Sequence, residues 1–167
     1  MKNLYIFGVG LIGGSIALKA RSLNTFDEII GIGRSGGNSL ESLVTSGALD
    51  YSSTEIDENI NKASLIIIAT PVAQTKLILK KIEPFLDAKT IITDVGSTKS
   101  IVMSEARLAL KNKFSQFIGS HPIAGSEKHG ALAAKKDLFY GKNIILTPNN
   151  KNSLEQIIKL TKFWESL

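Results

Sequence analysis

The stretch IFGVGLIGGSIAL, residues 6–18, joins an apolar run to a helical pattern through a cluster of glycines. Gly8, Gly10 and Gly13 follow the spacing G-x-G-x-x-G. In this spacing the first glycine permits a tight turn, the second lets the backbone approach a pyrophosphate, and the third lets helix and strand pack closely. The stretch therefore predicts a strand, a turn and a helix that bind a dinucleotide, the alternative being a glycine-rich turn without a ligand. The expected contacts are Gly8, Gly10, Leu11, Ile12 and Gly13.

Beyond this turn, short β-rich runs alternate with amphipathic helical patterns. The predicted strands span 3–9, 28–33, 64–70, 90–95, 116–120 and 143–148. The predicted helices span 11–22, 38–46, 72–86, 98–112 and 152–166. Several strands are apolar on both faces, which is typical of parallel sheets covered by helices. The sequence therefore predicts an α/β fold of the Rossmann type, a doubly wound, mostly parallel sheet flanked by helices, as one dinucleotide-binding domain over residues 1–167.

Composition narrows the class of protein. The chain has 167 residues, of which 43% are hydrophobic, so it can bury one sizeable core. It has no cysteine, which excludes disulfides and thiolate metal sites and is typical of a reducing compartment. No run reaches the roughly 18 apolar residues that a membrane-spanning helix needs, and the N-terminus lacks a signal-peptide pattern. We expect a cytoplasmic domain with no metal site and no membrane partner.

The net charge of +5 comes from lysines that are scattered along the chain rather than gathered in a block. Nucleic-acid binding requires a basic stripe, often with aromatic side chains that stack on bases, and aromatic residues make up only 7% of this chain. Scattered lysines are typical of a solvated surface. We therefore expect a small-molecule substrate and no nucleic-acid partner.

The residues after the second predicted strand bear on the choice of dinucleotide. NAD-binding folds usually carry an acidic residue there, which binds the adenosine ribose. Here the strand ends in Gly33, and Arg34 and Ser35 follow. The missing carboxylate removes a charge that would repel a 2′-phosphate, and the arginine and hydroxyl can bind that phosphate. The sequence therefore favours NADP, with NAD as the alternative if Arg34 only stacks on the adenine.

Two later stretches place polar residues after predicted strands. IITDVGSTKS, residues 91–100, contains Ser97, and FIGSHPIAGSEKHGA, residues 117–131, contains His121. The carboxyl ends of parallel strands hold ligands in such folds, so Ser97 and His121 are candidates to converge on the cofactor. A neutral imidazole can take up a proton as an alcohol is oxidised. The alternatives are that Ser97 or Thr98 only caps the next helix and that His121 only binds its own loop.

Four motifs, in this order and spacing, resemble the prephenate and arogenate dehydrogenase family of tyrosine biosynthesis. They are GVGLIGGSIAL, IIIATPV, TDVGSTK and GSHPIAGSE, which lie within residues 6–127. GSHPIAGSE is the most specific of them, and the pattern of strands and helices extends the resemblance to nearly the whole chain. The resemblance implies an oxidative decarboxylation, in which hydride passes from the carbon that bears the ring hydroxyl to nicotinamide and carbon dioxide leaves.

The resemblance also implies roles for individual residues. His121 would bind the ring hydroxyl and receive its proton, and Ser97 would hold both the histidine and the nicotinamide in place. Ser126 and Glu127 match positions that border the substrate pocket. The expected contacts along the cofactor after the third predicted strand are Thr70, Pro71 and Val72.

The chain departs from the family's pattern at its C-terminal end. Members resemble two-part proteins, in which a helical C-terminal domain follows, forms the homodimer and supplies cations for the substrate carboxylates. This chain ends at Leu167, so we expect it to be the nucleotide domain without that helical domain, with doubtful catalysis of its own. The last predicted helix should keep a partly uncovered apolar face, formed by Leu154, Ile157, Ile158, Leu160, Phe163 and Trp164.

Two other functions remain open from the sequence. The first is another NADP-dependent dehydrogenase or an imine reductase on the same fold, which would keep the glycines but should lack GSHPIAGSE. The second is an NADP-binding module without turnover, in which His121 would be inert.

Overall fold

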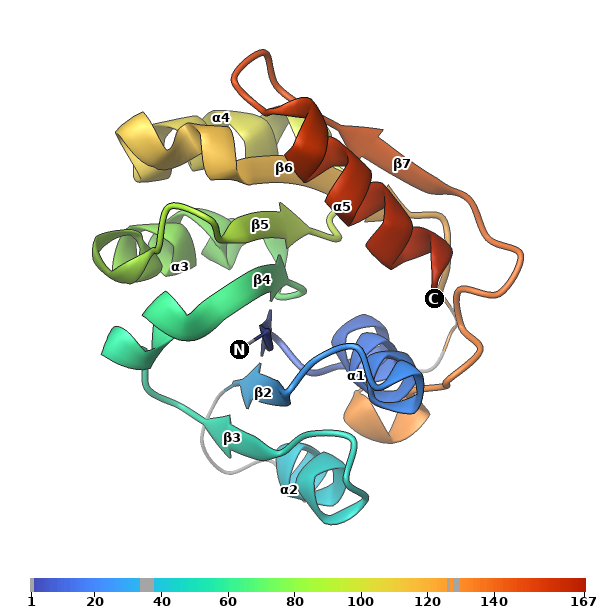
Figure 1. Ribbon diagram of the computed structural model, residues 1–167. Coiled ribbons are helices and arrows are strands. Elements are labelled where there is room, and N and C mark those ends of the chain that lie inside the picture. Colours follow the sequence, from blue (N-terminus) through green and yellow to red (C-terminus); the bar gives the residue numbers. More distant parts are fainter. Residues whose placement is uncertain (1, 34–37, 126, 128–129) are drawn as a thin grey trace.

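The computed structural model describes residues 2–33, 38–125, 127 and 130–167, with residues 38 and 39 described by their backbone alone. The described chain forms a seven-stranded sheet in the order β3-β2-β1-β4-β5-β6-β7, with helices on both faces (Figure 1). Strands β1 to β6 pair in parallel, and β7 runs antiparallel to β6. The strands are β1 (Asn3–Phe7), β2 (Glu28–Ile32), β3 (Tyr51–Ser53), β4 (Ala63–Ile68), β5 (Ile91–Asp94), β6 (Phe117–Pro122) and β7 (Ile144–Thr147).

Among the described residues, five α-helices and five short 3-10 turns accompany these strands. The helices are α1 (Leu11–Leu23), α2 (Asn38–Thr45), α3 (Thr75–Ile82), α4 (Lys99–Leu110) and α5 (Leu154–Glu165). The 3-10 turns are η1 (Glu58–Lys62), η2 (Val72–Gln74), η3 (Glu83–Phe85), η4 (Lys111–Gln116) and η5 (Ala131–Ala133). Within the described ranges, no helix combines the length and the apolar character that crossing a membrane requires.

The central strands are buried on both faces because each face packs against a helical layer. In β1, Leu4 and Ile6 belong to the core that α1, α2 and α5 cover. Tyr5 and Phe7, which alternate with them, belong to the core that α3 and α4 cover. This period of two explains why the strands read as continuous apolar runs in the sequence. The predicted doubly wound fold is confirmed.

Two local features differ from the prediction. No sequence pattern predicted β3, which has three residues at the sheet edge, with Tyr51 exposed. The helix predicted over 72–86 is also shorter, because η2 follows Pro71 and η3 contains Pro84, so that only α3 is α-helical. Proline lacks the N–H that a helix interior needs, which accounts for the interruption at Pro84.

Helix α5 buries part of its predicted apolar face against the sheet. Leu160 and Trp164 are buried, and the indole packs edge-on against the rings of Phe139 and Phe163. Leu154 and Ile158 are 72% and 44% exposed. The predicted apolar face is therefore partly uncovered, as expected, at Leu154 and Ile158.

The glycine turn yields a prediction about folding stability. A Cβ at position 13 would stand 2.3 Å from the carbonyl oxygen of Gly8 and 3.0 Å from Cγ2 of Ile6. We expect Gly13→Ala to lower the free energy of unfolding by about 1–3 kcal/mol, measured by urea denaturation.

Gly10→Ala is the matched control, because a Cβ at position 10 meets nothing within 4 Å. Its free energy of unfolding should stay within about 0.5 kcal/mol of that of the parent chain. Equal losses in the two variants would show that glycine at position 13 is not required by the close packing.

Candidate functional site

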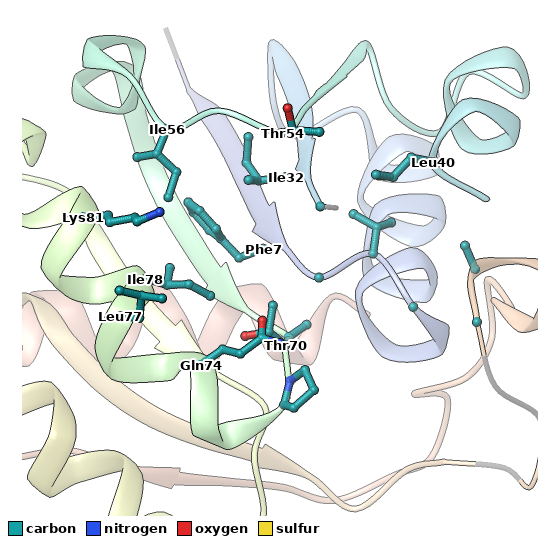
Figure 2. Close-up of a pocket in the computed structure, with 18 residues that line it drawn as sticks. Phe7, Ile32, Leu40, Thr54, Ile56, Thr70, Gln74, Leu77, Ile78 and Lys81 are labelled. Atoms are coloured by element: carbon teal, nitrogen blue, oxygen red, sulfur yellow. The ribbon is translucent and has the colours of Figure 1, made fainter. Parts of the chain in front are cut away.

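The carboxyl ends of β1, β2 and β4 open onto a groove of about 730 Å³ (Figure 2). Sheet order reverses between β1 and β4, and α/β sheets bind ligands at such a point. The volume is within the usual range for small-molecule sites. The groove is lined by Phe7, Gly8, Val9, Gly10, Ile32, Gly33, Leu40, Thr54, Ile56, Ala69, Thr70, Pro71, Gln74, Leu77, Ile78, Lys81, Gly130 and Ala131.

The turn between β1 and α1 forms one wall of this groove. Gly8 has a φ of +85°, and a Cβ there would stand 2.8 Å from the carbonyl carbon and oxygen of Ala69, so only glycine fits. Gly10 precedes α1 and has open space where a Cβ would lie. The first turn of α1 has no side-chain cap and no acidic residue. The backbone N–H groups of this turn, which a helix leaves without intrahelical partners, therefore suit an anion.

The chain after β4 forms the facing wall. Thr70 and Pro71 both line the groove. The hydroxyl oxygen of Thr70 is buried and has no hydrogen-bond partner among the described residues. Buried hydroxyls are normally paired, so an unpaired one on a groove wall fits a ligand that supplies the partner.

Four of the expected cofactor residues do not line the groove. Leu11 and Ile12 pack against the core under α1, and Gly13 packs against the backbone of Gly8. Val72 packs against the core on the other face of the sheet. These cofactor roles stay predictions, as do those of Gly8, Gly10, Thr70 and Pro71.

Helix α3 and the turn before it contribute lining residues that sequence reasoning did not single out. Gln74, Leu77, Ile78 and Lys81 line the groove, and Figure 2 shows Lys81 beside Ile56 and Phe7. Their spacing of three to four residues places them on one helical face. This spacing was the sequence signal that could have identified these lining residues, but the same spacing is equally typical of a solvent-facing helical stripe.

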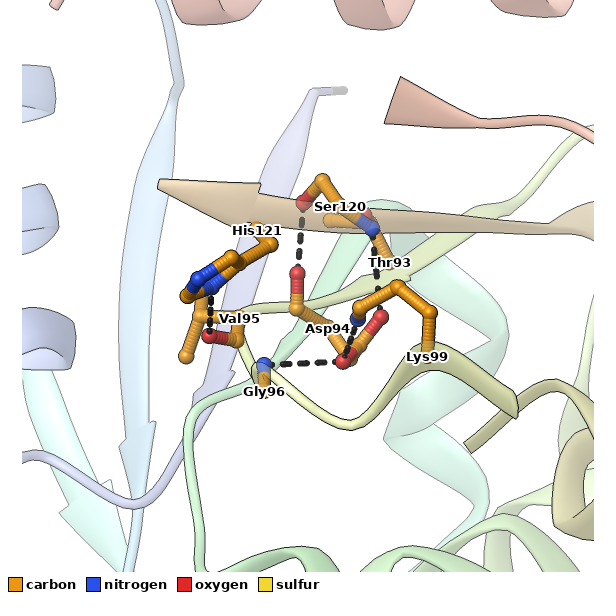
Figure 3. A network of polar contacts seen from close by, with 7 residues as sticks. All are labelled: Thr93, Asp94, Val95, Gly96, Lys99, Ser120 and His121. Carbon is orange, nitrogen blue, oxygen red and sulfur yellow. Dashed lines mark hydrogen bonds and ion pairs between the residues drawn. The ribbon is translucent and has the colours of Figure 1, made fainter. Parts of the chain in front are cut away.

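A second cluster of polar groups lies where β5 and β6 end (Figure 3). Asp94, the last residue of β5, is 2% exposed. Its Oδ1 accepts a hydrogen bond from the backbone N–H of Ser120 at 3.2 Å, and its Oδ2 accepts one from Gly96 at 2.8 Å. Oδ2 also forms an ion pair with Lys99. One carboxylate thus joins β6, the β5–α4 loop and the first residue of α4.

Burial sets the electrostatics of this cluster. It raises the pKa of Asp94, although Lys99 and the two backbone N–H groups act in the opposite direction. Burial lowers the pKa of Lys99, and the carboxylate opposes this change. The ion pair therefore offsets the cost of burying each charge.

The hydroxyls of this cluster reinforce the connection between the two strands. Ser120 Oγ donates a hydrogen bond to the backbone carbonyl of Asp94 at 2.5 Å. Thr93 Oγ1 lies 2.9 Å from the same hydroxyl and donates to it, because the serine proton is already engaged. All three residues are buried, so the network is shielded from water.

His121 lies next to this network, near the end of β6. Its Nδ1 is 3.5 Å from the backbone carbonyl of Val95, on the β5–α4 loop. The histidine therefore approaches the neighbouring β5–α4 loop. His121 also lines a shallow hollow of about 430 Å³ with residues 122–125 and Lys142.

Ser97 is exposed on the same β5–α4 loop, two residues after Val95. The residue that precedes α4 is Thr98, and its side chain makes no capping hydrogen bond. The structure brings the loops that carry Ser97 and His121 together through Val95 and Asp94. Their catalytic roles stay predictions.

The remaining expected site residues are placed only in part. Glu127 is exposed. Arg34, Ser35 and Ser126 lie outside the described residues. Among the residues that are described, no group of three His, Cys, Asp or Glu side chains could hold a metal ion.

Comparison with known sequences matches this chain to prephenate dehydrogenases. A family model described as the nucleotide-binding domain of prephenate dehydrogenase matches residues 16–167. The prephenate dehydrogenase of Bacillus subtilis is 39% identical over 164 residues, which cover 96% of this chain and 44% of the relative. That of Lactococcus lactis is 36% identical over 160 residues, which cover 95% of this chain and 44% of the relative.

Solved structures agree with this match. The A. aeolicus prephenate dehydrogenase in complex with hydroxyphenyl propionate and NAD+ superimposes with a TM-score of 0.89 at 30% identity, covering 99% of this chain and 57% of that one. Synechocystis arogenate dehydrogenase gives 0.87 at 29% identity, covering 98% and 56%. The chain therefore spans about half the length of its relatives.

The unpaired hydroxyl of Thr70 yields a prediction for the ligand-free chain. Thr70→Val replaces the hydroxyl by a methyl group of similar size, so the cost of burying an unpaired polar group disappears. We expect the free energy of unfolding to stay the same or to rise by up to about 1 kcal/mol in urea denaturation.

Thr93→Val is the matched control, because the Thr93 hydroxyl is buried and paired with Ser120. It should lower the free energy of unfolding by about 0.5–1.5 kcal/mol. A loss at position 70 as large as that at position 93 would show that the Thr70 hydroxyl is satisfied in the free protein.

Proposed function

Because this chain belongs to the family of prephenate dehydrogenase nucleotide-binding domains, we propose that it binds a nicotinamide dinucleotide in the groove at the carboxyl ends of β1 and β4. The observation that carries the proposal is the N-terminus of α1, which is uncapped, free of acidic residues and preceded by open space at Gly10. This arrangement suits a pyrophosphate.

The groove fits such a cofactor in two further respects. Gly8 brings the turn against Ala69, so the two walls of the groove meet at backbone distance. Thr70 presents a buried hydroxyl that lacks a partner among the described residues and that a bound ribose or amide would satisfy. The backbone of the glycine turn would hold the phosphates, and the chain after β4 would lie along the cofactor.

We further propose NADP rather than NAD as the cofactor of this chain. The A. aeolicus relative was solved with NAD+. In this chain β2 is followed by Gly33, Arg34 and Ser35, and no carboxylate is present there to bind a ribose or to repel a 2′-phosphate. A guanidinium and a hydroxyl are suitable partners for that phosphate.

The reaction that we propose is the oxidative decarboxylation of prephenate or arogenate in tyrosine biosynthesis. A nicotinamide bound in the groove would accept hydride from the carbon that bears the ring hydroxyl. His121 accepts the hydroxyl proton as that oxygen becomes a carbonyl. Carbon dioxide then leaves, the electron pair of the broken bond passes through the ring to the carbonyl oxygen, and that oxygen takes the proton back from His121 as the ring becomes a phenol. The contact with Val95 suits this role, because an Nδ1 that donates to the carbonyl leaves Nε2 free to accept a proton.

The other residues of the β5–α4 and β6 loops would hold the reactants. Ser97 would orient His121 and the nicotinamide from the loop that Val95 begins. Ser126 and Glu127 would border the substrate. Since the chain spans about half the length of its relatives, we propose that a helical C-terminal domain completes the substrate site and forms a homodimer in the cytoplasm.

The proposed cofactor choice is tested by calorimetric titration of the chain with NADP and with NAD at equal salt. We expect Arg34→Ala to weaken NADP binding by about tenfold or more and to leave NAD binding within about twofold, because it removes a charge-assisted contact to the 2′-phosphate. Arg107→Ala is the control, since Arg107 lies on α4 over the Phe114 ring of η4 and does not line the groove. Equal losses for both dinucleotides would exclude this role for Arg34.

The proposed proton acceptor is tested by turnover in a chain that retains the helical domain. We expect His121→Asn to lower kcat by about a hundredfold or more and to leave the dinucleotide Kd nearly unchanged. Arg107→Ala on α4 is again the control and should leave both constants unchanged. Unchanged turnover in His121→Asn would exclude His121 as the proton acceptor, whereas a parent chain that binds NADP without any turnover would favour the module without catalysis.

A further inference from the structure

The Asp94 carboxylate contacts the immediate neighbours of both proposed catalytic residues. Its Oδ1 accepts from the N–H of Ser120, which precedes His121. Its Oδ2 accepts from the N–H of Gly96, which precedes Ser97. Figure 3 shows the carboxylate between the end of β6 and the β5–α4 loop.

Lys99 stabilises the ionised form of the Asp94 carboxylate. Its ammonium group pairs with Oδ2, the oxygen that also accepts from Gly96, and its side chain is only 16% exposed. An ionised carboxylate accepts on both oxygens, whereas a protonated one has an O–H that would face one of the two N–H donors. The cation thus favours the form of Asp94 that can accept from Ser120 and Gly96 together.

We propose that Asp94, paired with Lys99, is a positioning residue that sets the distance between Ser97 and His121. This inference rests on the proposed function of those two side chains. Among the described residues, further contacts between the two strand ends are the hydroxyl of Ser120 on the Asp94 carbonyl, the Thr93 hydroxyl on that of Ser120, and the 3.5 Å approach of His121 to Val95. The approach of His121 to Val95 is long for a hydrogen bond and would not fix the imidazole by itself.

The distance between Ser97 and His121 matters because the proposed reaction depends on geometry. A reaction that transfers a hydride and a proton from one substrate carbon and its oxygen needs both acceptors in place at once. Misplacement of a catalytic group by about 1 Å can cost about a hundredfold in rate. A carboxylate bonded to the residues adjacent to both side chains restrains their separation without touching the substrate.

The test is nuclear magnetic resonance on the chain itself. Asp94→Asn keeps the shape but has only one acceptor oxygen, so one of the two N–H groups must face an amide donor. We expect amide hydrogen exchange at Ser120 or Gly96 to accelerate by about tenfold or more, and the imidazole resonances of His121 to shift. A His129→Gln chain assigns these resonances, because the sequence has two histidines.

Lys99 variants provide a second reading if Asp94→Asn does not fold. Lys99→Met leaves the buried carboxylate without its cation and favours its protonated form, so it should accelerate the same amides and shift the same resonances. Lys99→Arg keeps the charge and should retain the exchange rates and resonances of the parent chain.

Asp50→Asn is the control for a purely structural effect. Asp50 also accepts from a backbone N–H, that of Ile29, and pairs with Arg21. Its replacement should lower the free energy of unfolding and leave the His121 resonances unchanged. If folded Asp94→Asn or Lys99→Met chains keep the exchange rates and resonances of the parent, the positioning role is overturned. A parent chain that binds no dinucleotide would instead overturn the proposed function, because the exchange readout needs no cofactor.

Discussion

The contact between three backbone segments at the end of β1 is the constraint on which the rest of the structure depends. Gly8 abuts the carbonyl of Ala69, and Gly13 of α1 abuts the carbonyl of Gly8. These contacts fix how closely α1 approaches β1 and how closely the chain after β4 approaches the turn. These contacts therefore position the two walls of the groove. The N-terminus of α1 faces the groove because no side chain at Gly8 or Gly13 separates the helix from the strand.

A second constraint acts at the ends of β5 and β6, and it is polar rather than steric. Asp94 is buried with its partners around it, whereas the glycine turn depends on the absence of side chains. A buried carboxylate is tolerated because each of its oxygens has a donor. The two constraints act on different parts of the site. The glycine turn shapes the groove in which a cofactor would lie, and the carboxylate connects the loops that would carry the chemistry.

Much of this arrangement could be predicted because its signals are local. The order of strand, glycine turn and helix at residues 6–18 lies within one short stretch, and the two-sided apolar runs identify a covered sheet. The strand β3 could not be predicted, since three edge residues carry no periodic pattern. The role of Asp94 could not be predicted either, because its partner Ser120 lies 26 residues away and the spacing does not encode which strands adjoin. Lys81 was missed for a similar reason: its helical face meets the groove only after α3 packs beside β4.

The burial of the Asp94 and Lys99 pair has a consequence for how the two halves of the site respond to ionic strength. Mobile ions screen charges that water surrounds, and they screen buried pairs much less. An anion at the N-terminus of α1 would meet the protein in an open groove, where added salt weakens its attraction. The ion pair of Asp94 and Lys99 is largely enclosed by protein, so mobile ions have little access to it. Raising the ionic strength would therefore weaken the binding of a phosphate, while the distance between the loops that carry Ser97 and His121 stayed the same.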